Sequence, residues 1–303
     1  MQNIQRLHGP LFLANFFYGI NFSIAKIALP HYIPPFAFIL LRVSVAGLLF
    51  FLMHRMFVNE KIERSDYKGL LLCSLFGVAI NQLLFFIGLS LTTPIHASLI
   101  MIMTPVLVVV LTRIINNERT TPLKTLGIVI ALAGALVLIL LGKDVSQGSN
   151  TLLGDSCIFF NATSYAIYLI IVKPYTKKYH PVTVAKTIFL FALPLVFITG
   201  FSQFKNINWH TFSPAVWGSV ASVVIGATFL AYLFNSIALR YTSPAVVGAY
   251  IYIQPVIATL LSVFMFHEPL TWVKLFSAIA ICTGVYLTTV SGNSAMIGIK
   301  QSH

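Results

Sequence analysis

Charge is scarce in this sequence of 303 residues, in which Lys, Arg, Asp and Glu together make up only 9%, against about 25% in soluble domains. Apolar residues make up 58%, so a fold in water would leave a large apolar surface uncovered. Apolar runs of about 20 residues, long enough to cross a bilayer as helices, recur along the chain. We therefore predict an all-α membrane protein whose main partner is the lipid bilayer.

Cysteine is also rare. Cys73, Cys157 and Cys282 lie in three different apolar runs, and their spacing fits neither a metal site nor a disulfide framework. We expect free thiols, no metal and no cofactor.

Only seven residues are acidic, and all lie in connections or near the ends of apolar runs. They are Glu60, Glu63, Asp66, Glu118, Asp144, Asp155 and Glu268. A carboxylate at the end of a span can stay hydrated or cap a helix. The sequence therefore predicts no deep carboxylate of the kind that relays protons in many pumps.

Enzyme motifs are missing as well, among them Gly-x-Ser-x-Gly, His-Glu-x-x-His and the phosphate-binding Gly-rich loops. The net charge of +12 forms no extended basic face, because Lys and Arg occupy short connections, and this argues against nucleic acid as a partner. We expect a protein that is not an enzyme, with an intramembrane enzyme or a channel-like facilitator as the alternative to a transporter.

What the sequence does contain is ten apolar runs separated by charged or Pro-rich breaks. They lie near residues 9–29, 34–56, 68–91, 94–115, 122–142, 152–172, 182–202, 214–239, 244–266 and 270–291. With the N-terminus inside, the inner connections contain 13 Lys and Arg and the outer ones 3. Because cytoplasmic loops carry the excess of Lys and Arg, we predict a multi-pass protein of the cell (inner) membrane with both termini in the cytoplasm.

The two halves of the chain repeat each other. At an offset of 150, identical residues align in pairs, including Pro94 with Pro244, Pro105 with Pro255, Glu118 with Glu268, Gly134 with Gly284 and Gly142 with Gly292. We predict one five-helix repeat over residues 9–142 and a second over 152–292. Because five is odd, the second copy enters the membrane from the opposite side, and inverted repeats of this kind recur in secondary transporters.

These features resemble the EamA-type branch of the drug/metabolite transporter superfamily over about residues 9–292. The resemblance rests on Pro105, Glu118 and Gly134, on their counterparts Pro255, Glu268 and Gly284, and on the pairs Tyr18-Gly19 and Leu41-Arg42. It implies ten spans, a central cavity and movement of amino acids or other small metabolites, often as export. Position 18 is Tyr where the family often has Trp.

Two mid-span prolines predict interrupted helices. Pro105 and Pro255 each lack an amide donor and leave the carbonyl four residues earlier, on Met101 and Ile251, without its helical partner. Each interruption is interpreted either as a gate with a carbonyl lining a cavity or as a fixed bend filled by a neighbouring hydroxyl.

Small residues predict close helix packing near the end of each half. Gly127, Ala131 and Ala135 recur every four residues in one span, and Ala280 and Gly284 do so in another. Such spacing lets helix backbones approach closely. It fits contacts within the bundle and contacts in a homodimer equally well.

Polar residues inside the spans predict the substrate site, because polar groups in lipid normally turn toward the bundle interior or a wet cavity. Helical spacing puts Asn15 and Tyr18 on one face of the first span, and Asn161, Tyr165 and Tyr168 on one face of the sixth. The remaining candidates are Asn81, Tyr232, Asn235, Tyr250 and Gln254. Any one of them could instead be a tie between helices.

Two titratable residues lie deeper than the connections and complete the predicted site. Arg42 could clamp a substrate carboxylate or tie together helix-end carbonyls. His96 has no counterpart in the repeat, where Val246 occupies its place, and we expect it to make transport depend on pH. We predict a secondary transporter that exports amino acids or amphipathic compounds by alternating access.

Overall fold

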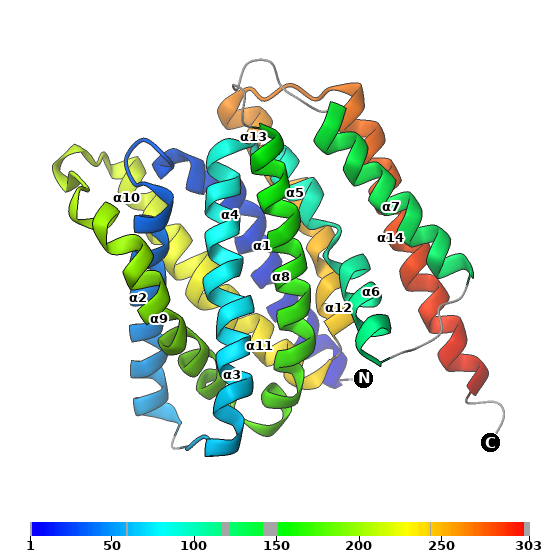
Figure 1. The fold of residues 1–303 in the computed structure, drawn as a ribbon, viewed down its shortest axis with the longest axis horizontal. Coiled ribbons are helices and arrows are strands. Elements are labelled where there is room, and N and C mark those ends of the chain that lie inside the picture. The colour runs from blue at the N-terminus through cyan, green and yellow to red at the C-terminus, as the bar shows by residue number, and fades with distance from the viewer. Residues whose placement is uncertain (1, 59, 117–121, 142–150, 243, 300–303) are drawn as a thin grey trace.

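The computed structural model describes residues 2–58, 60–116, 122–141, 151–242 and 244–299, and within these ranges every regular element is a helix. Figure 1 shows the helices running side by side, mostly along one direction. The first half contains α1 (Gln2–Ala28), α2 (Pro35–Phe57), η1 (Arg64–Asp66), α3 (Tyr67–Ser74), η2 (Leu75–Ala79), α4 (Ile80–Leu91), α5 (Pro94–Met101), α6 (Thr104–Asn116) and α7 (Pro122–Leu141).

The second half contains a similar succession of helices, with the additional short helix η6. Its elements are α8 (Thr151–Lys178), α9 (Pro181–Lys205), η4 (Trp209–Thr211), α10 (Pro214–Ala221), η5 (Ser222–Leu230), α11 (Ala231–Tyr241), α12 (Pro244–Ala249), η6 (Tyr250–Tyr252), α13 (Ile253–Phe266) and α14 (Trp272–Ile299). Among the described residues, seven helical segments are long and apolar enough to cross a membrane. Shorter apolar helices cover Thr125–Leu141, Tyr250–Phe266 and Trp272–Gly284.

Large apolar side chains cover the outside of the bundle as well as its core. Phe57, Ile198, Phe264 and Trp272 are each 74% to 77% exposed, and they lie on α2, α9, α13 and α14. In water such a surface would be unfavourable, whereas lipid tails are as apolar as these side chains. The chain is therefore a multi-pass membrane protein.

Prolines mark the start of α5 and the break that follows it. Pro94 begins α5, and the Thr93 hydroxyl caps that helix by accepting a hydrogen bond from the His96 amide at 3.2 Å. The helix breaks after Met101, and α6 begins at Thr104, directly before Pro105. The Thr104 hydroxyl donates to the Met101 carbonyl at 2.8 Å, so a hydroxyl fills this break. The equivalent start at Ser243 lies outside the described residues.

The helices α7 and α14 form a layer of their own at one side of the molecule (Figure 1). A Cβ added at Gly284 would lie 2.5 Å from the backbone of Ala131 and Gly127, and one at Gly134 would lie 2.9 Å from the Ala280 Cβ. The small residues therefore join two helices within one chain. The predicted possibility of a homodimer stays a prediction.

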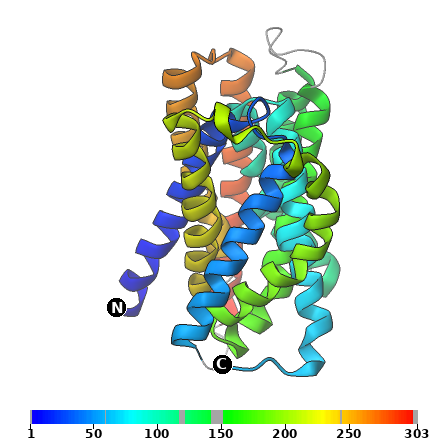
Figure 2. The ribbon, with the colours of Figure 1, turned by 90° about the vertical axis from the view of Figure 1, so that its left-hand side faces the viewer.

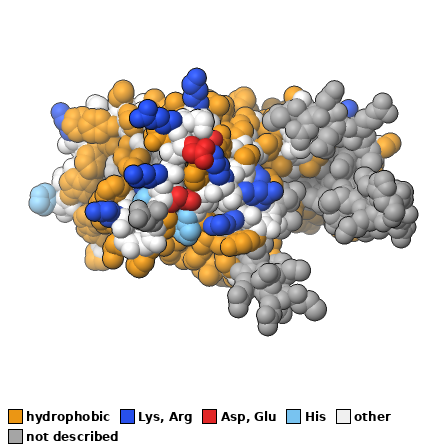
Figure 3. Space-filling view, turned by 90° about the horizontal axis from the view of Figure 1, so that it is seen from below, with side chains coloured by type: hydrophobic (Ala, Val, Ile, Leu, Met, Phe, Trp, Pro, Cys, Tyr) orange, Lys and Arg blue, Asp and Glu red, His pale blue; other side chains and the backbone are white. Residues whose placement is uncertain are grey.

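Charged side chains gather at one end of the bundle, where α2 ends, α3 begins and α8 meets α9. Figure 3 shows Lys and Arg with a few acids on this face. Lys178 pairs there with Glu63 and Asp66, each at 2.7 Å. The start of α1 and the end of α14 point toward the same end (Figures 1 and 2).

Candidate substrate cavity

A cavity lies between the helices of the two halves, with walls from α1, α2, α4, α5, α8, α11 and α13. Its lining residues are Tyr18, Asn21, Phe22, Arg42, Asn81, Gln82, Phe85, Met101, Asn161, Tyr165, Tyr232 and Gln254. Seven of these were predicted from the sequence: Tyr18, Arg42, Asn81, Asn161, Tyr165, Tyr232 and Gln254. The cavity is therefore amphipathic, with amides and phenols on one hand and phenyl rings on the other.

One wall is fixed by a reciprocal pair of amides. Asn81 on α4 donates to the carbonyl of Asn161 at 3.3 Å, and Asn161 on α8 donates to the carbonyl of Asn81 at 2.6 Å. Both side chains are buried. The two side chains link the helices through their amide nitrogens, which donate to the backbone. They also line the cavity, because their amide oxygens form no hydrogen bond within this pair.

Tyr232 on α11 is one of the lining residues of the cavity. Its phenol donates to the carbonyl of Gly77 at 2.5 Å and accepts from Gln82 at 3.4 Å. Gly77 lies in the π-helical segment η2, and π-segments often mark functional sites. A Cβ at Gly77 would lie 2.2 Å from the Tyr168 ring, so only glycine lets that ring pack there.

The tyrosines form one connected group. Asn235 on α11 donates to the phenol of Tyr165 at 2.9 Å and lies 3.5 Å from that of Tyr18. The ring of Tyr168 stacks on Tyr165 at 5.9 Å between centroids. Asn235 and Tyr168 therefore lie behind the lining residues and hold them in place.

Asn15 and Tyr250 also lie outside the lining. Asn15 accepts from Gln254 at 2.7 Å and donates to the carbonyl of Leu11 at 2.8 Å, so it links α1 to α13 and orients Gln254. Tyr250 lies in η6, where it is half-buried against the apolar core. Neither residue is among those that line the cavity.

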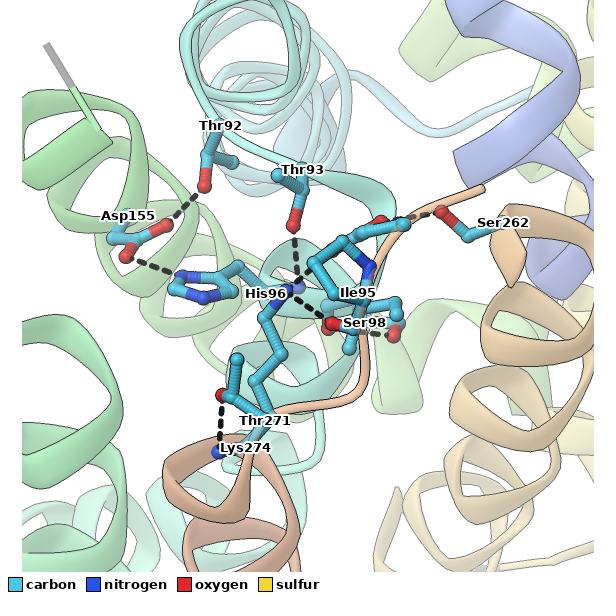
Figure 4. Close-up of polar contacts among 11 residues, drawn as sticks. Thr92, Thr93, Ile95, His96, Ser98, Asp155, Ser262, Thr271 and Lys274 are labelled. Carbon is cyan, nitrogen blue, oxygen red and sulfur yellow. Dashed lines mark hydrogen bonds and ion pairs between the residues drawn. The ribbon is translucent and has the colours of Figure 1, made fainter. Parts of the chain in front are cut away.

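His96 lies apart from the cavity, in a buried polar cluster between α5 and α8. Its Nδ1 is 2.9 Å from Oδ2 of Asp155, both side chains are fully buried, and Thr92 donates to the other oxygen of Asp155. Figure 4 shows the imidazole pointing at this carboxylate. The His96 ring therefore has a fixed partner on another helix.

The expectation that the carboxylates near span ends stay hydrated is wrong for Asp155 and Glu268. Glu268 is 6% exposed, lies 3.1 Å from Nζ of Lys274 and accepts from Ser262. Helix packing supplies these partners, and a buried charge needs them. Glu118 and Asp144 lie outside the described residues.

Sequence analysis missed five lining residues: Asn21, Phe22, Gln82, Phe85 and Met101. Asn21 and Gln82 are polar residues within apolar runs, and that signal could have found them. Phe22 and Phe85 lie four residues after Tyr18 and Asn81, so helical spacing puts them on the same polar faces. Met101 could not be found in this way, because the apolar runs contain many similar residues. Among the described residues, no group of three or more His, Cys, Asp or Glu side chains is placed to hold a metal ion.

Comparisons with known proteins find similarity to membrane transporters. The sequence model of the EamA-like transporter family matches residues 10–140 and again residues 152–290. The uncharacterized transporter YyaM of Bacillus subtilis (strain 168) is 25% identical over 279 residues, which cover 91% of this chain and 90% of that protein. An uncharacterized transporter of Archaeoglobus fulgidus is 26% identical over 230 residues, which cover 76% and 78%.

Two further proteins are similar over most of the chain at lower sequence identity. A WAT1-related protein of Arabidopsis thaliana is 22% identical, with 90% of this chain and 80% of that protein covered. A solved crystal structure superposes with a TM-score of 0.63 at 18% identity, over 92% of this chain and 98% of the other, which shows a common fold. Because the family match covers most of the sequence, the chain belongs to the EamA-like transporter family and is a membrane transporter.

Proposed function

We propose that this protein is a secondary transporter that moves small metabolites, such as amino acids or amphipathic compounds, through the central cavity by alternating access, with export as the physiological direction. The observation that carries the proposal is the position of the cavity. Its walls come from both halves of the chain. The helices α1, α2, α4 and α5 belong to the first half, and α8, α11 and α13 belong to the second. Rocking of two such halves opens a central site to each face in turn.

Equivalent contacts in the two halves support ten spans arranged as inverted repeats. The helices α2 and α9, which correspond in the repeat, pack against each other, and so do α7 and α14. The contact of α1 with α13 is matched by that of α8 with α6, and the contact of α4 with α8 by that of α11 with α1. A twofold axis in the membrane plane would generate such pairs.

The same relation extends into the cavity. Gln82 and Tyr232 are separated by the repeat offset of 150 residues, and their side chains meet at 3.4 Å. Equivalent residues approach each other only near a twofold axis, so the cavity lies where the axis would pass. A site on this axis is reached equally from either side when the halves rock.

A flux measurement tests the proposal. Purified protein is reconstituted in liposomes loaded with a metabolite mixture, and mass spectrometry follows which compounds leave faster than from protein-free liposomes. Tyr18→Cys, in a background without native cysteines, should react with a water-soluble thiol reagent, and the reaction should block the flux. The matched control is Leu13→Cys on the same helix, where the side chain is 43% exposed on the apolar outside.

Two results would contradict the proposal. One is the absence of any protein-dependent flux from an extract of broad composition. The other is equal reactivity of Tyr18→Cys and Leu13→Cys, because a wet cavity exposes the first position to the reagent and lipid shields the second.

A further inference from the structure

Arg42 is a buried cation inside the membrane-spanning bundle. It lies about two turns from the start of α2 at Pro35, is only 3% exposed, and lines the cavity. A guanidinium group stays charged in proteins, and a charge at such a depth is expensive unless it is paired or faces water.

The contacts of Arg42 use only part of its guanidinium group. Nε donates to the Thr228 hydroxyl on η5 at 2.7 Å, and the group lies 4.5 Å from the centroid of the Phe86 ring. These contacts hold one edge and one face of the planar group. The two terminal nitrogens form no hydrogen bond with the described residues, so this fork of donors remains available at the cavity wall.

The described part of the chain provides no counter-ion for Arg42. The two buried carboxylates are engaged elsewhere, Asp155 by His96 and Glu268 by Lys274. Glu63 and Asp66 pair with Lys178 at the charged end of the bundle, and Glu60 accepts a hydrogen bond from the His180 amide at 2.8 Å. Among the described residues, the guanidinium group of Arg42 is thus left for an anionic ligand, and its planar fork matches a carboxylate in a bidentate arrangement.

The rest of the lining indicates the body of such a ligand. Phe22, Phe85 and Met101 provide apolar surface. The amide oxygens of Asn21 and Gln82 are buried without a hydrogen-bond partner among the described residues, and they would accept a hydrogen bond if the bound ligand brought a donor. These groups suit a small molecule with one anionic end, an apolar body and an optional hydroxyl or ammonium group.

We propose that Arg42 binds the carboxylate of the transported molecule, and that the substrates are small carboxylates with an apolar body. This inference rests on the proposed transport function. Thr228 then positions the guanidinium from the second half while α2 holds it from the first, so the bound carboxylate contacts a residue that both halves fix. Free carboxylates and zwitterionic amino acids share this chemistry.

The test measures binding with matched probes of three sizes: alanine, leucine and phenylalanine, their amides, and the corresponding acids without the amino group. Affinities for purified wild-type protein are taken from ligand-dependent melting at millimolar concentrations. We expect the acids of at least one size to bind at least tenfold more tightly than the matched amide. Binding of both the amino acid and the deaminated acid points to a general carboxylate site, and binding of the amino acid alone shows that the ammonium is also required.

Variants assign the preference to Arg42. In Arg42→Gln the ratio between acid and amide should fall to about one, and Arg42→Lys should keep part of it because the charge remains. Arg55→Gln removes the same charge from the exposed end of the same helix and should leave the ratio unchanged. The ratio is measured within each variant, so a general loss of stability does not alter it. If Arg42→Gln fails to fold, the acid-to-amide ratio of the wild-type protein still tests whether the site prefers a carboxylate.

The proposal is overturned if wild-type protein binds the amides as tightly as the acids, if no acid of the panel binds, or if Arg42→Gln keeps the preference. These outcomes are separate from failure of the transport proposal. Protein-dependent flux that is confined to compounds without a carboxylate would preserve transport and refute the carboxylate site. A carboxylate preference without any flux would refute transport and preserve a binding site.

Discussion

At the scale of single residues, the position of His96 can be predicted from the sequence, but its buried pairing with Asp155 cannot. Sequence alone places His96 inside a span, because it falls between apolar residues of one run. It does not reveal Asp155 as the partner, since the two positions are 59 residues apart and meet only when α5 packs against α8. The same holds for Glu268, whose partner on α14 depends on the turn between two helices.

We predict that His96 makes transport depend on pH. Imidazole is the side chain whose charge most readily changes near neutral pH, and that of His96 lies 2.9 Å from the Asp155 carboxylate with both side chains fully buried. A change of buried charge alters the balance between conformations that keep the pair enclosed and those that open it. Initial flux, measured at fixed membrane potential between about pH 5 and 8, should vary in wild-type protein and become flat in His96→Gln.

The control for this prediction is His31→Gln, which removes an exposed imidazole and should keep the wild-type profile. If His96→Gln and wild type show the same dependence on pH, then another group is responsible. The next groups to examine are Lys274, which Figure 4 labels, and its buried partner Glu268, 3.1 Å away.

The cavity shows a similar division between what can and cannot be predicted. Polar residues such as Asn81 and Asn161 stand out because they interrupt apolar runs. Their hydrogen bonds to each other's backbone carbonyls depend on the distance between α4 and α8, which no local pattern encodes. Phe22 and Phe85 are set apart from rings that face lipid only by their helical spacing from Tyr18 and Asn81.

At the scale of helices, prolines and small residues were informative, whereas π-segments were not. Pro105 marks the break between α5 and α6 because proline cannot donate the helical hydrogen bond. The π-helical segments η2 and η5 occur where no proline is present. Gly77 and Gly226 lie in these segments against the rings of Tyr168 and Phe17, and the sequence shows them only as two glycines among many.

We predict that Gly284→Val weakens the layer formed by α7 and α14. A Cβ there would lie 2.5 Å from the Gly127 carbonyl oxygen and the Ala131 amide nitrogen, so the helices must separate, at a cost of about 1–3 kcal/mol for overpacking. The melting temperature in detergent should fall. Gly218→Ala is the matched control, because nothing lies within 4 Å of a Cβ at that position, and an unchanged melting temperature of Gly284→Val would contradict the close packing.

At the scale of the whole molecule, hydropathy predicts most of the helices because lipid leaves the backbone no alternative to internal hydrogen bonds. Each predicted span corresponds to one or more observed helices, with ends that differ by several residues in the longest cases, such as α8 and α9. The packing partners were not predictable. Contacts such as α4 with α8 join the two halves and are set by complementary side-chain shapes that a single sequence does not display.

The final prediction concerns orientation in the membrane. Inner connections contain 13 Lys and Arg and outer ones 3, and the charged end of the bundle in Figure 3 contains Lys178 with Glu63 and Asp66. Moving that end across the bilayer would oppose the positive-inside rule. Reporter fusions after residues 60, 118 and 178 and at the C-terminus should therefore report the cytoplasm, and fusions after 147 and 206 the outside. An outside signal at 118 or 178 would refute the inverted repeat, because an odd number of spans in the first half requires the two halves to enter from opposite faces.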